Sequence, residues 1–151
     1  MTTKIPEGYT TITPTLNIDG AAEAIELYKN AFGARVEMRV DNPKGDGKVL
    51  HSCLLIGNSK IFVADLCPEM GSGSPSKSTF YLYVDDVDSA FAKAQKSGLA
   101  EKSVPQDMFY GDRTGVLTDK FGNTWCLATH VRDVSKDEMD KAMKQMSNKA
   151  A

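Results

Sequence analysis

The chain has 151 residues, of which 41% are hydrophobic and 25% are charged, and its formal net charge is −2. This length fits one domain or two small fused units, and the composition is that of an ordinary globular protein able to build a core. The weak negative charge argues against non-specific nucleic-acid binding, which needs a basic surface.

The sequence also carries no sign of export or membrane insertion. No apolar run approaches the roughly 20 residues of a membrane span. The first residues, MTTKIPEGYTTITP, lack the apolar centre of a signal peptide. We therefore expect a cytoplasmic protein that binds neither membrane nor nucleic acid. Its three cysteines, Cys53, Cys67 and Cys126, have no CxxC spacing and are most simply free thiols.

The first half of the chain predicts a strand, a helix and three more strands. Alternation favours a strand over Tyr9–Ile18. Asp19 is placed to cap a helix whose apolar stripe runs from Ala21 to Phe32, with Gly33 as its stop. The strands that follow are predicted at Ala34–Val40, Val49–Ile56 and Lys60–Asp65.

The same pattern then starts again. After the stretch Cys67–Lys77, CPEMGSGSPSK, comes a strand over Thr79–Val84, a cap at Asp85 and Asp86, and a helix that ends at Gly98. Ala100–Gln106 reads as an irregular segment. A hairpin follows, with arms Thr114–Thr118 and Asn123–Ala128 and the loop Asp119–Gly122.

These two halves form an internal repeat of strand, helix and three strands. We predict a first βαβββ module over residues 1–66, a linker over 67–78, a second βαβββ module over 79–131, and a C-terminal helix and tail over 132–151. Ser135 and Glu138 fit a capping box for the last helix. The apolar stripe of that helix, Met139, Ala142, Met143 and Met146, is typical of a packing surface.

Motifs in the second half carry a family resemblance. They are Gly111-Asp112-Arg113, the spaced set Asp119, Phe121, Gly122 and Trp125, and Ala128-Thr129-His130. Together they resemble the PhnB-like branch of the vicinal oxygen chelate superfamily, which includes glyoxalase I, extradiol dioxygenases and the fosfomycin and bleomycin resistance proteins. The resemblance implies an α+β fold in which two βαβββ modules form a curved mixed sheet around a small-molecule site. It also implies a homodimer, since family members commonly pair or exchange modules between chains.

Metal-dependent members of that family hold a divalent ion with His, Glu or Gln side chains from four strands. The matching positions in this sequence are Thr13, Thr79 and Cys126, with a fourth point in the apolar run Ile61–Ala64. Two threonines, a thiol and an apolar residue do not suit a hard divalent ion. We therefore expect no metal cofactor, and we keep Thr13, Thr79 and Cys126 as candidate ligand-binding residues.

His51 is the candidate catalytic residue, because an unperturbed imidazole titrates near neutral pH. Cys53 shares its strand face, so the two could form half of a zinc site, with Cys126 as a third ligand. Alternatively, His51 simply forms a hydrogen bond within the sheet. An enzyme of lyase, isomerase or dioxygenase-like type would use His51 with Asp112 or Arg113.

The stretch Phe109–Arg113 reads as a binding loop. Tyr110 supplies an aromatic ring, and Asp112 and Arg113 could clamp a ligand or pair with each other. Trp125 could stack on a ligand or belong to the core. The sequence therefore predicts a small-molecule-binding protein without a catalytic metal, with the enzyme as the alternative.

Overall fold

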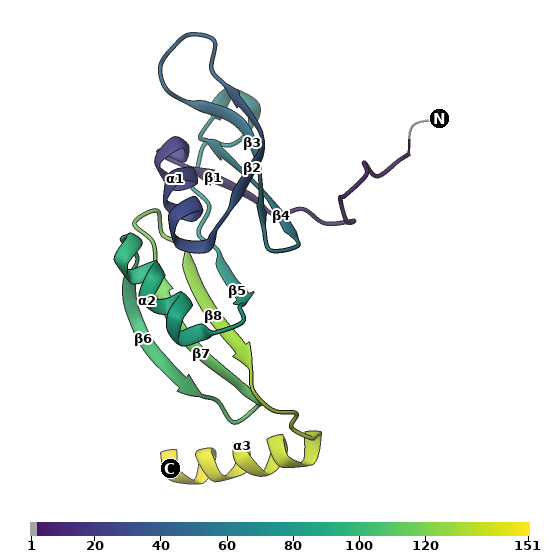
Figure 1. The fold of residues 1–151 in the computed structure, drawn as a ribbon, viewed down its shortest axis with the longest axis vertical. Coiled ribbons are helices and arrows are strands. Elements are labelled where there is room, and N and C mark those ends of the chain that lie inside the picture. The colour runs from purple at the N-terminus through teal and green to yellow at the C-terminus, as the bar shows by residue number, and fades with distance from the viewer. Residues whose placement is uncertain (1–2) are drawn as a thin grey trace.

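The computed structural model describes residues 3–151; residues 1 and 2, at the start of the predicted first module, lie outside the described residues. The chain forms two βαβββ modules arranged end to end, followed by a helix (Figure 1). The first module contains β1 (Thr15–Ile18), α1 (Ala21–Phe32), β2 (Arg35–Asp41), β3 (Val49–Ile56) and β4 (Ser59–Asp65). The second contains β5 (Thr79–Tyr83), α2 (Val87–Ser97), β6 (Ala100–Asp107), β7 (Asp112–Thr118) and β8 (Thr124–His130). Along the chain, the short helix η1 (Pro68–Met70) follows β4 and precedes β5, and α3 (Lys136–Ala150) ends the chain.

Both modules build the same kind of sheet. The strand order is β1-β4-β3-β2 in the first and β5-β8-β7-β6 in the second. In each sheet the first strand pairs in parallel with the last, and the remaining pairs are antiparallel. The predicted α+β fold and its internal repeat are confirmed. Within the described chain each module keeps its own four-stranded sheet, so one chain alone does not close a single curved sheet.

Two strand predictions need correction. The first strand begins at Thr15, not at Tyr9, and Pro14 directly precedes it. Proline has no N–H to extend the ladder, although its carbonyl still accepts a bond from the Phe62 N–H at 2.9 Å. The segment predicted as irregular is the edge strand β6. Pro105 is tolerated there because an edge strand can leave one side unpaired, and two register shifts mark the irregularity.

The predicted cap of α1 was also wrong. Gly20, not Asp19, occupies the N-cap, with φ 98° and no side-chain bond of its own. The free N–H groups of Gly20 and Ala21 instead donate to Oδ1 of Asp65, at 3.0 and 3.1 Å, from the end of β4. The other oxygen of Asp65 accepts from the Val49 N–H at 2.7 Å. The carboxylate of Asp65, which is distant in sequence, thus accepts the hydrogen bonds of the free N–H groups at the helix start, where a local cap was expected to do so.

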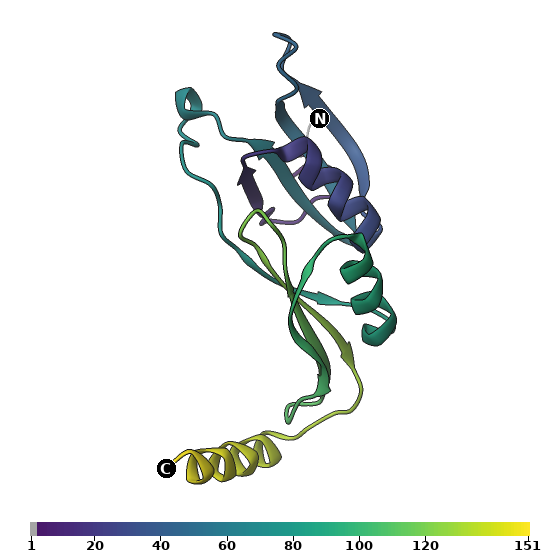
Figure 2. The same cartoon turned by 90° about the vertical axis from the view of Figure 1, so that its left-hand side faces the viewer.

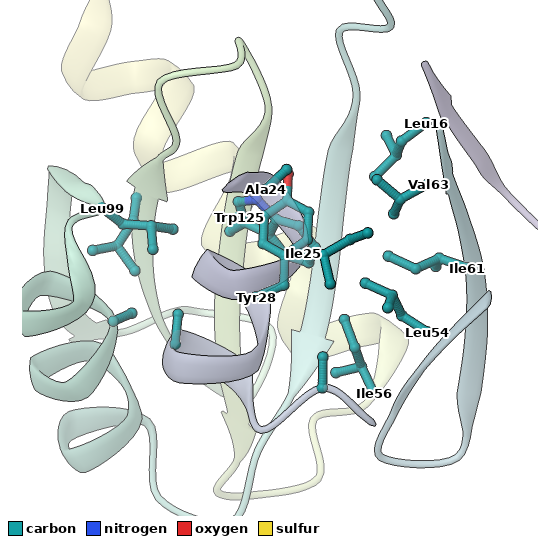
Figure 3. Close-up of a cluster of buried hydrophobic side chains, with 14 of the residues drawn as sticks. Leu16, Ala24, Ile25, Tyr28, Leu54, Ile56, Ile61, Val63, Leu99 and Trp125 are labelled. Atoms are coloured by element: carbon teal, nitrogen blue, oxygen red, sulfur yellow. The ribbon is translucent and has the colours of Figure 1, made fainter. Parts of the chain in front are cut away.

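One core joins the two modules. Helices α1 and α2 pack against each other on the same side of the sheets. Figure 3 shows the side chains of α1 meeting those of the first sheet on one side and Trp125 of β8 on the other. The Trp125 ring centroid lies 5.0 Å from Tyr28, 4.4 Å from Phe32 and 4.6 Å from Phe80. Aromatic packing around this ring therefore holds the modules together.

Helix α3 stands apart from this core. Figures 1 and 2 place it beyond the end of the second sheet, and none of its side chains is buried. Ser135 caps it as predicted, accepting from the Glu138 N–H at 3.2 Å. Met143 and Met146 are 49% and 44% exposed, so the predicted apolar stripe has no cover within one chain. Across residues 3–151, none of the helices combines the length and apolarity that crossing a membrane requires.

Candidate functional site

The polar candidates of the second module gather on the sheet face that points away from α2. Residues alternate across a strand, so Tyr81 and Tyr83 of β5 share this face with Cys126 of β8, which pairs with Tyr81. Asp112 and His130, paired across β7 and β8, lie on the same face. We call Tyr81, Tyr83, Asp112, Cys126 and His130 the tyrosine–carboxylate face.

Asp112 is the centre of this face. The residue is only 4% exposed, yet its carboxylate has three side-chain partners. Its Oδ2 accepts from the Tyr81 hydroxyl at 2.7 Å and from the Tyr83 hydroxyl at 3.0 Å. Its Oδ1 lies 2.8 Å from Nδ1 of His130, and Nε2 of that ring lies 2.8 Å from Asp133. The network fixes both tyrosine rings and satisfies a carboxylate that would be costly to bury alone.

The hydrogen bonds also set the charge state of the face. Burial opposes ionisation of Asp112, but the bonds from Tyr81, His130 and Tyr83 outweigh it and hold its pKa below the usual range. Burial, followed by the bond to Asp112 and the nearby Tyr110, raises the pKa of Tyr81. Burial and the Asp112 charge raise the pKa of the Cys126 thiol. Near neutral pH the face therefore presents an ionised carboxylate, neutral phenols and a protonated thiol.

His130 provides a pH test of this network. The bonds to Asp133 and then to Asp112 raise the pKa of its imidazole. The folded state thus binds this proton more tightly than the unfolded chain does. The stabilisation is complete below the unfolded pKa of about 6.5 and is lost as pH rises through the folded-state pKa. We expect an NMR titration to give His130 a lower midpoint in an Asp133→Asn variant than in the natural protein. An equal midpoint in the two proteins would contradict the bridging geometry.

The first module also has a sheet face directed away from α1, which the N-terminal arm partly covers, so that Cys53 on it is 0% exposed. His51 and Cys53 of β3 share it with Phe62 of β4, because Cys53 pairs with Phe62. The His51 ring contacts Phe62 edge-on at 4.7 Å between centroids. Tyr9 of the N-terminal arm donates to Cys53 Sγ at 3.5 Å, and Lys60 Nζ lies 4.1 Å from the Tyr9 ring centre. We call His51, Cys53, Tyr9, Lys60 and Phe62 the first-module face.

The predicted enzymatic set is not assembled within one chain. His51 belongs to β3 and Asp112 to β7, and these two strands lie in different sheets (Figure 1). Arg113 is the neighbour of Asp112 in β7, so its side chain points to the opposite face. There it bonds Asp88 of α2, at 2.9 and 3.0 Å, and Asp107 of β6, at 3.2 Å. Of the two alternatives for these residues, pairing of Asp112 with Arg113 does not occur, and Arg113 cannot join Asp112 in clamping one ligand.

The remaining predicted site residues are spread over several places. Thr13 lies in the arm before β1, Thr79 begins β5 on the open side, and Tyr110 lies in the turn before β7. The structure therefore corrects the predicted loop Phe109–Arg113, since Asp112 and Arg113 are already strand residues.

Trp125 is 2% exposed and packs mainly in the core. Trp125 also lines a cleft of about 280 Å³ between the N-terminal arm and β5, together with Tyr81 and Lys60.

The sequence pattern carries one feature of this face and misplaces another. The alternation of Tyr81 and Tyr83 on one strand predicts that both rings share a face, where they line a cavity or pack in a core or interface; within one chain they are 45% and 62% exposed and so are not core residues. His130 read as a residue beyond the last strand, but it is the last residue of β8 and lies opposite Asp112. Only the correct hairpin register places it there.

Known protein families and proteins match the sequence of this chain. The sequence profile of the Glyoxalase/Bleomycin resistance protein/Dioxygenase superfamily matches residues 10–127. An uncharacterized protein of Mycobacterium tuberculosis, Rv0887c, is 36% identical over 140 residues, covering 87% of this chain and 81% of that protein.

Solved structures are similar in fold. The X-ray structure of an Arabidopsis thaliana gene product matches with a TM-score of 0.64 and 29% identity, over 80% of this chain and 98% of that chain. A Bacillus cereus protein described as a putative 3-demethylubiquinone-9 3-methyltransferase, PhnB protein, matches with a TM-score of 0.62. It is 20% identical, over 80% of this chain and 99% of that chain, a level at which the likeness concerns the fold.

Proposed function

This chain belongs to the glyoxalase/bleomycin resistance protein/dioxygenase superfamily, and we propose that within it the protein binds a small organic molecule on the tyrosine–carboxylate face without a catalytic metal. The observation that carries the proposal is the Asp112 network. Tyr81 and Tyr83 keep 45% and 62% of their surface exposed while their hydroxyls are fixed by a buried carboxylate. Rings held in place but left open are suited to receive a ligand without a large loss of side-chain entropy.

The residues at the family's metal positions do not fit a divalent ion. Thr79 and Cys126 lie on the face, but one offers a hydroxyl and the other a thiol whose pKa is raised. Thr13 lies outside the strands, and Ile61–Ala64 supplies no donor side chain. Nowhere in residues 3–151 do three His, Cys, Asp or Glu side chains gather in a group able to hold a metal. The proposed function therefore involves no metal ion.

We expect the purified protein to retain an organic ligand and no stoichiometric divalent metal. Native mass spectrometry of the protein as isolated, followed by elemental analysis after dialysis, checks both parts. A Tyr83→Leu variant, which removes an exposed ring, should lose the retained mass. A matched Val104→Leu variant on the β6 edge, where Val104 is 54% exposed, should keep it. One tightly held Zn, Ni, Mn or Fe per chain, or a retained mass unaffected by Tyr83→Leu, would contradict the proposal.

The ligand site is proposed to be completed by a second copy of the chain, in the cytoplasm. Within residues 3–151 of one chain, the two faces and the outer strand edges have no partner sheet. A homodimer that places the first-module face of one chain against the tyrosine–carboxylate face of the other would enclose a cup. His51 would then lie across from Asp112, which is the arrangement that the enzymatic alternative requires. Unpaired edges and apolar faces are commonly covered in this way.

We expect a homodimer in light scattering at micromolar concentration, with α3 contributing to association. Met143 and Met146 form an exposed apolar stripe suited to adaptable packing. Replacing both by serine should weaken the dimer by at least about tenfold. The control replaces Lys141 and Lys144, which are also exposed on α3, by serine. This change should leave association unchanged. A monomer that persists at high concentration would contradict the proposed assembly.

A further inference from the structure

The tyrosine pair has an unusual chemical setting. Its ring centroids are 5.2 Å apart with an interplanar angle of 60°, so the two rings form an edge-to-face corner rather than a flat stack. Both hydroxyl protons point at the same oxygen of Asp112. Neither phenol therefore has a proton left to donate to a ligand, and what the pair offers is the faces of its rings.

The charge on this face is negative. His130, the one basic group in the network, lies between the carboxylates of Asp112 and Asp133, so even a protonated imidazole adds one positive charge to two negative ones. The positions that β5, β7 and β8 contribute to this face include no lysine or arginine. Arg113, the nearest arginine in sequence, is held on the other face by Asp88 and Asp107. Lys60 of the first-module face, which the proposed dimer would place opposite, is paired with Glu37 at 2.7 Å and is therefore not a free partner for an anionic ligand.

Such a setting strengthens the attraction of a ring for a cation. An aromatic face carries partial negative charge from its quadrupole. A phenol that donates its proton to an ionised carboxylate gains further electron density, and the carboxylate adds its own field. Both effects act in the same direction at Tyr81 and Tyr83.

We propose that the ligand of this face carries an alkylated ammonium group, which sits in the corner between the rings of Tyr81 and Tyr83 with Asp112 behind them. This inference rests on the proposed small-molecule function and names the chemical class of its ligand. An alkylated ammonium needs no hydrogen-bond acceptor from the site, because its charge is spread over methyl groups that contact ring faces. Asp112 supplies the field and the positioning of the rings, and its own oxygens stay bonded to the protein.

The experiment compares two probes of nearly equal shape in the full-length protein. One is meta-(trimethylammonio)phenol and the other is meta-tert-butylphenol, which replaces the charged nitrogen by carbon. Isothermal titration at low ionic strength should show the cation binding about tenfold more tightly than its neutral analogue. The preference should shrink as added salt shortens the Debye length from about 30 Å to about 3 Å.

Three variants assign the preference to this face. Tyr83→Leu removes an exposed ring and should abolish the preference while the melting temperature stays close to that of the natural protein. Asp112→Asn should reduce it severalfold, and a melting curve reports whether that variant still folds. Asp107→Asn removes a carboxylate on the opposite face of the same sheet and should leave the preference unchanged.

The outcomes separate the inference from the proposed function. If both probes bind equally and Tyr83→Leu weakens both, the face binds small molecules without selecting cations, and only the inference fails. If the cation preference survives in Tyr83→Leu, its source lies elsewhere and the inference is wrong. If neither probe binds but the protein as isolated retains an organic mass, only the inference fails. If neither probe binds and no organic mass is retained, the face is not a small-molecule site, and both the inference and the proposed function fail.

Discussion

An Asp119→Ala variant should lose about 3–5 kcal/mol of unfolding free energy, because it removes a buried carboxylate that several groups share. Asp119 is 6% exposed and lies at the turn between β7 and β8. Its Oδ2 accepts from the Tyr28 hydroxyl at 2.6 Å and from the Trp125 indole N–H at 3.0 Å. Its Oδ1 accepts from the N–H groups of Phe121 and Asn123, at 3.0 and 2.9 Å.

The loss of unfolding free energy is large because the donors that would lose the Asp119 carboxylate are buried. Tyr28 and Trp125 are 0% and 2% exposed, so neither can turn to water when the carboxylate is gone. Tyr28 belongs to α1 and Trp125 to β8, which means the loss also loosens the contact between modules. Thermal unfolding of the variant should shift by roughly 10 °C or more for a chain of this size.

Lys120→Ala is the matched control for Asp119→Ala. Lys120 is the next residue in the same turn, and its ion pair with Glu23 joins two side chains that are 60% and 62% exposed. An exposed pair contributes little, so this change should stay within about 0.5 kcal/mol. Equal melting curves for Asp119→Ala and Lys120→Ala would show that the buried network is unimportant for stability.

The repeat and the secondary structure could be predicted because they depend on local patterns. The stripe on α1 and the alternation in β3 and β5 are read from a few neighbouring residues, and the structure has both modules in the predicted order. The cap of α1 could not be found in this way. Asp65 lies 45 residues beyond Gly20, and only the folded β4 brings its carboxylate to the helix start.

The candidate site was harder to predict because it depends on strand register. The predicted loop Asp119–Gly122 would pair Thr118 with Asn123. In the structure Thr118 pairs with Thr124, because Asn123 is drawn into the buried turn, where its N–H donates to Asp119. One residue of register decides which side chains share a face. It places His130 across from Asp112, where the shorter loop would have directed it away.

A Gly111→Ala variant should also be strongly destabilised, by about 2–4 kcal/mol, since two independent penalties meet at this residue. Gly111 has φ 102°, a conformation that side chains strongly disfavour. An added Cβ would in addition overlap the carbonyl oxygen of Arg132 and approach Val134 to 3.1 Å. The Arg132 contact is with backbone, so it cannot be relieved by a rotamer change.

The Gly111→Ala substitution should also change contacts of the tyrosine–carboxylate face. The carbonyl of Gly111 accepts from the N–H groups of Val131 and Arg132, at 2.9 and 3.1 Å, which holds the connector to α3 against β7. The connector is the segment between β8 and α3, residues 131–135. If it moves, Asp133 no longer contacts His130. The titration midpoint of His130 should then fall, and the melting temperature should fall with it. Gly57→Ala is the control, because φ is 58° there but an added Cβ meets nothing within 4 Å. It should cost about 1 kcal/mol and leave the His130 midpoint unchanged. A Gly111→Ala protein that melts like Gly57→Ala and keeps the His130 midpoint would mean that the connector is not held by this contact.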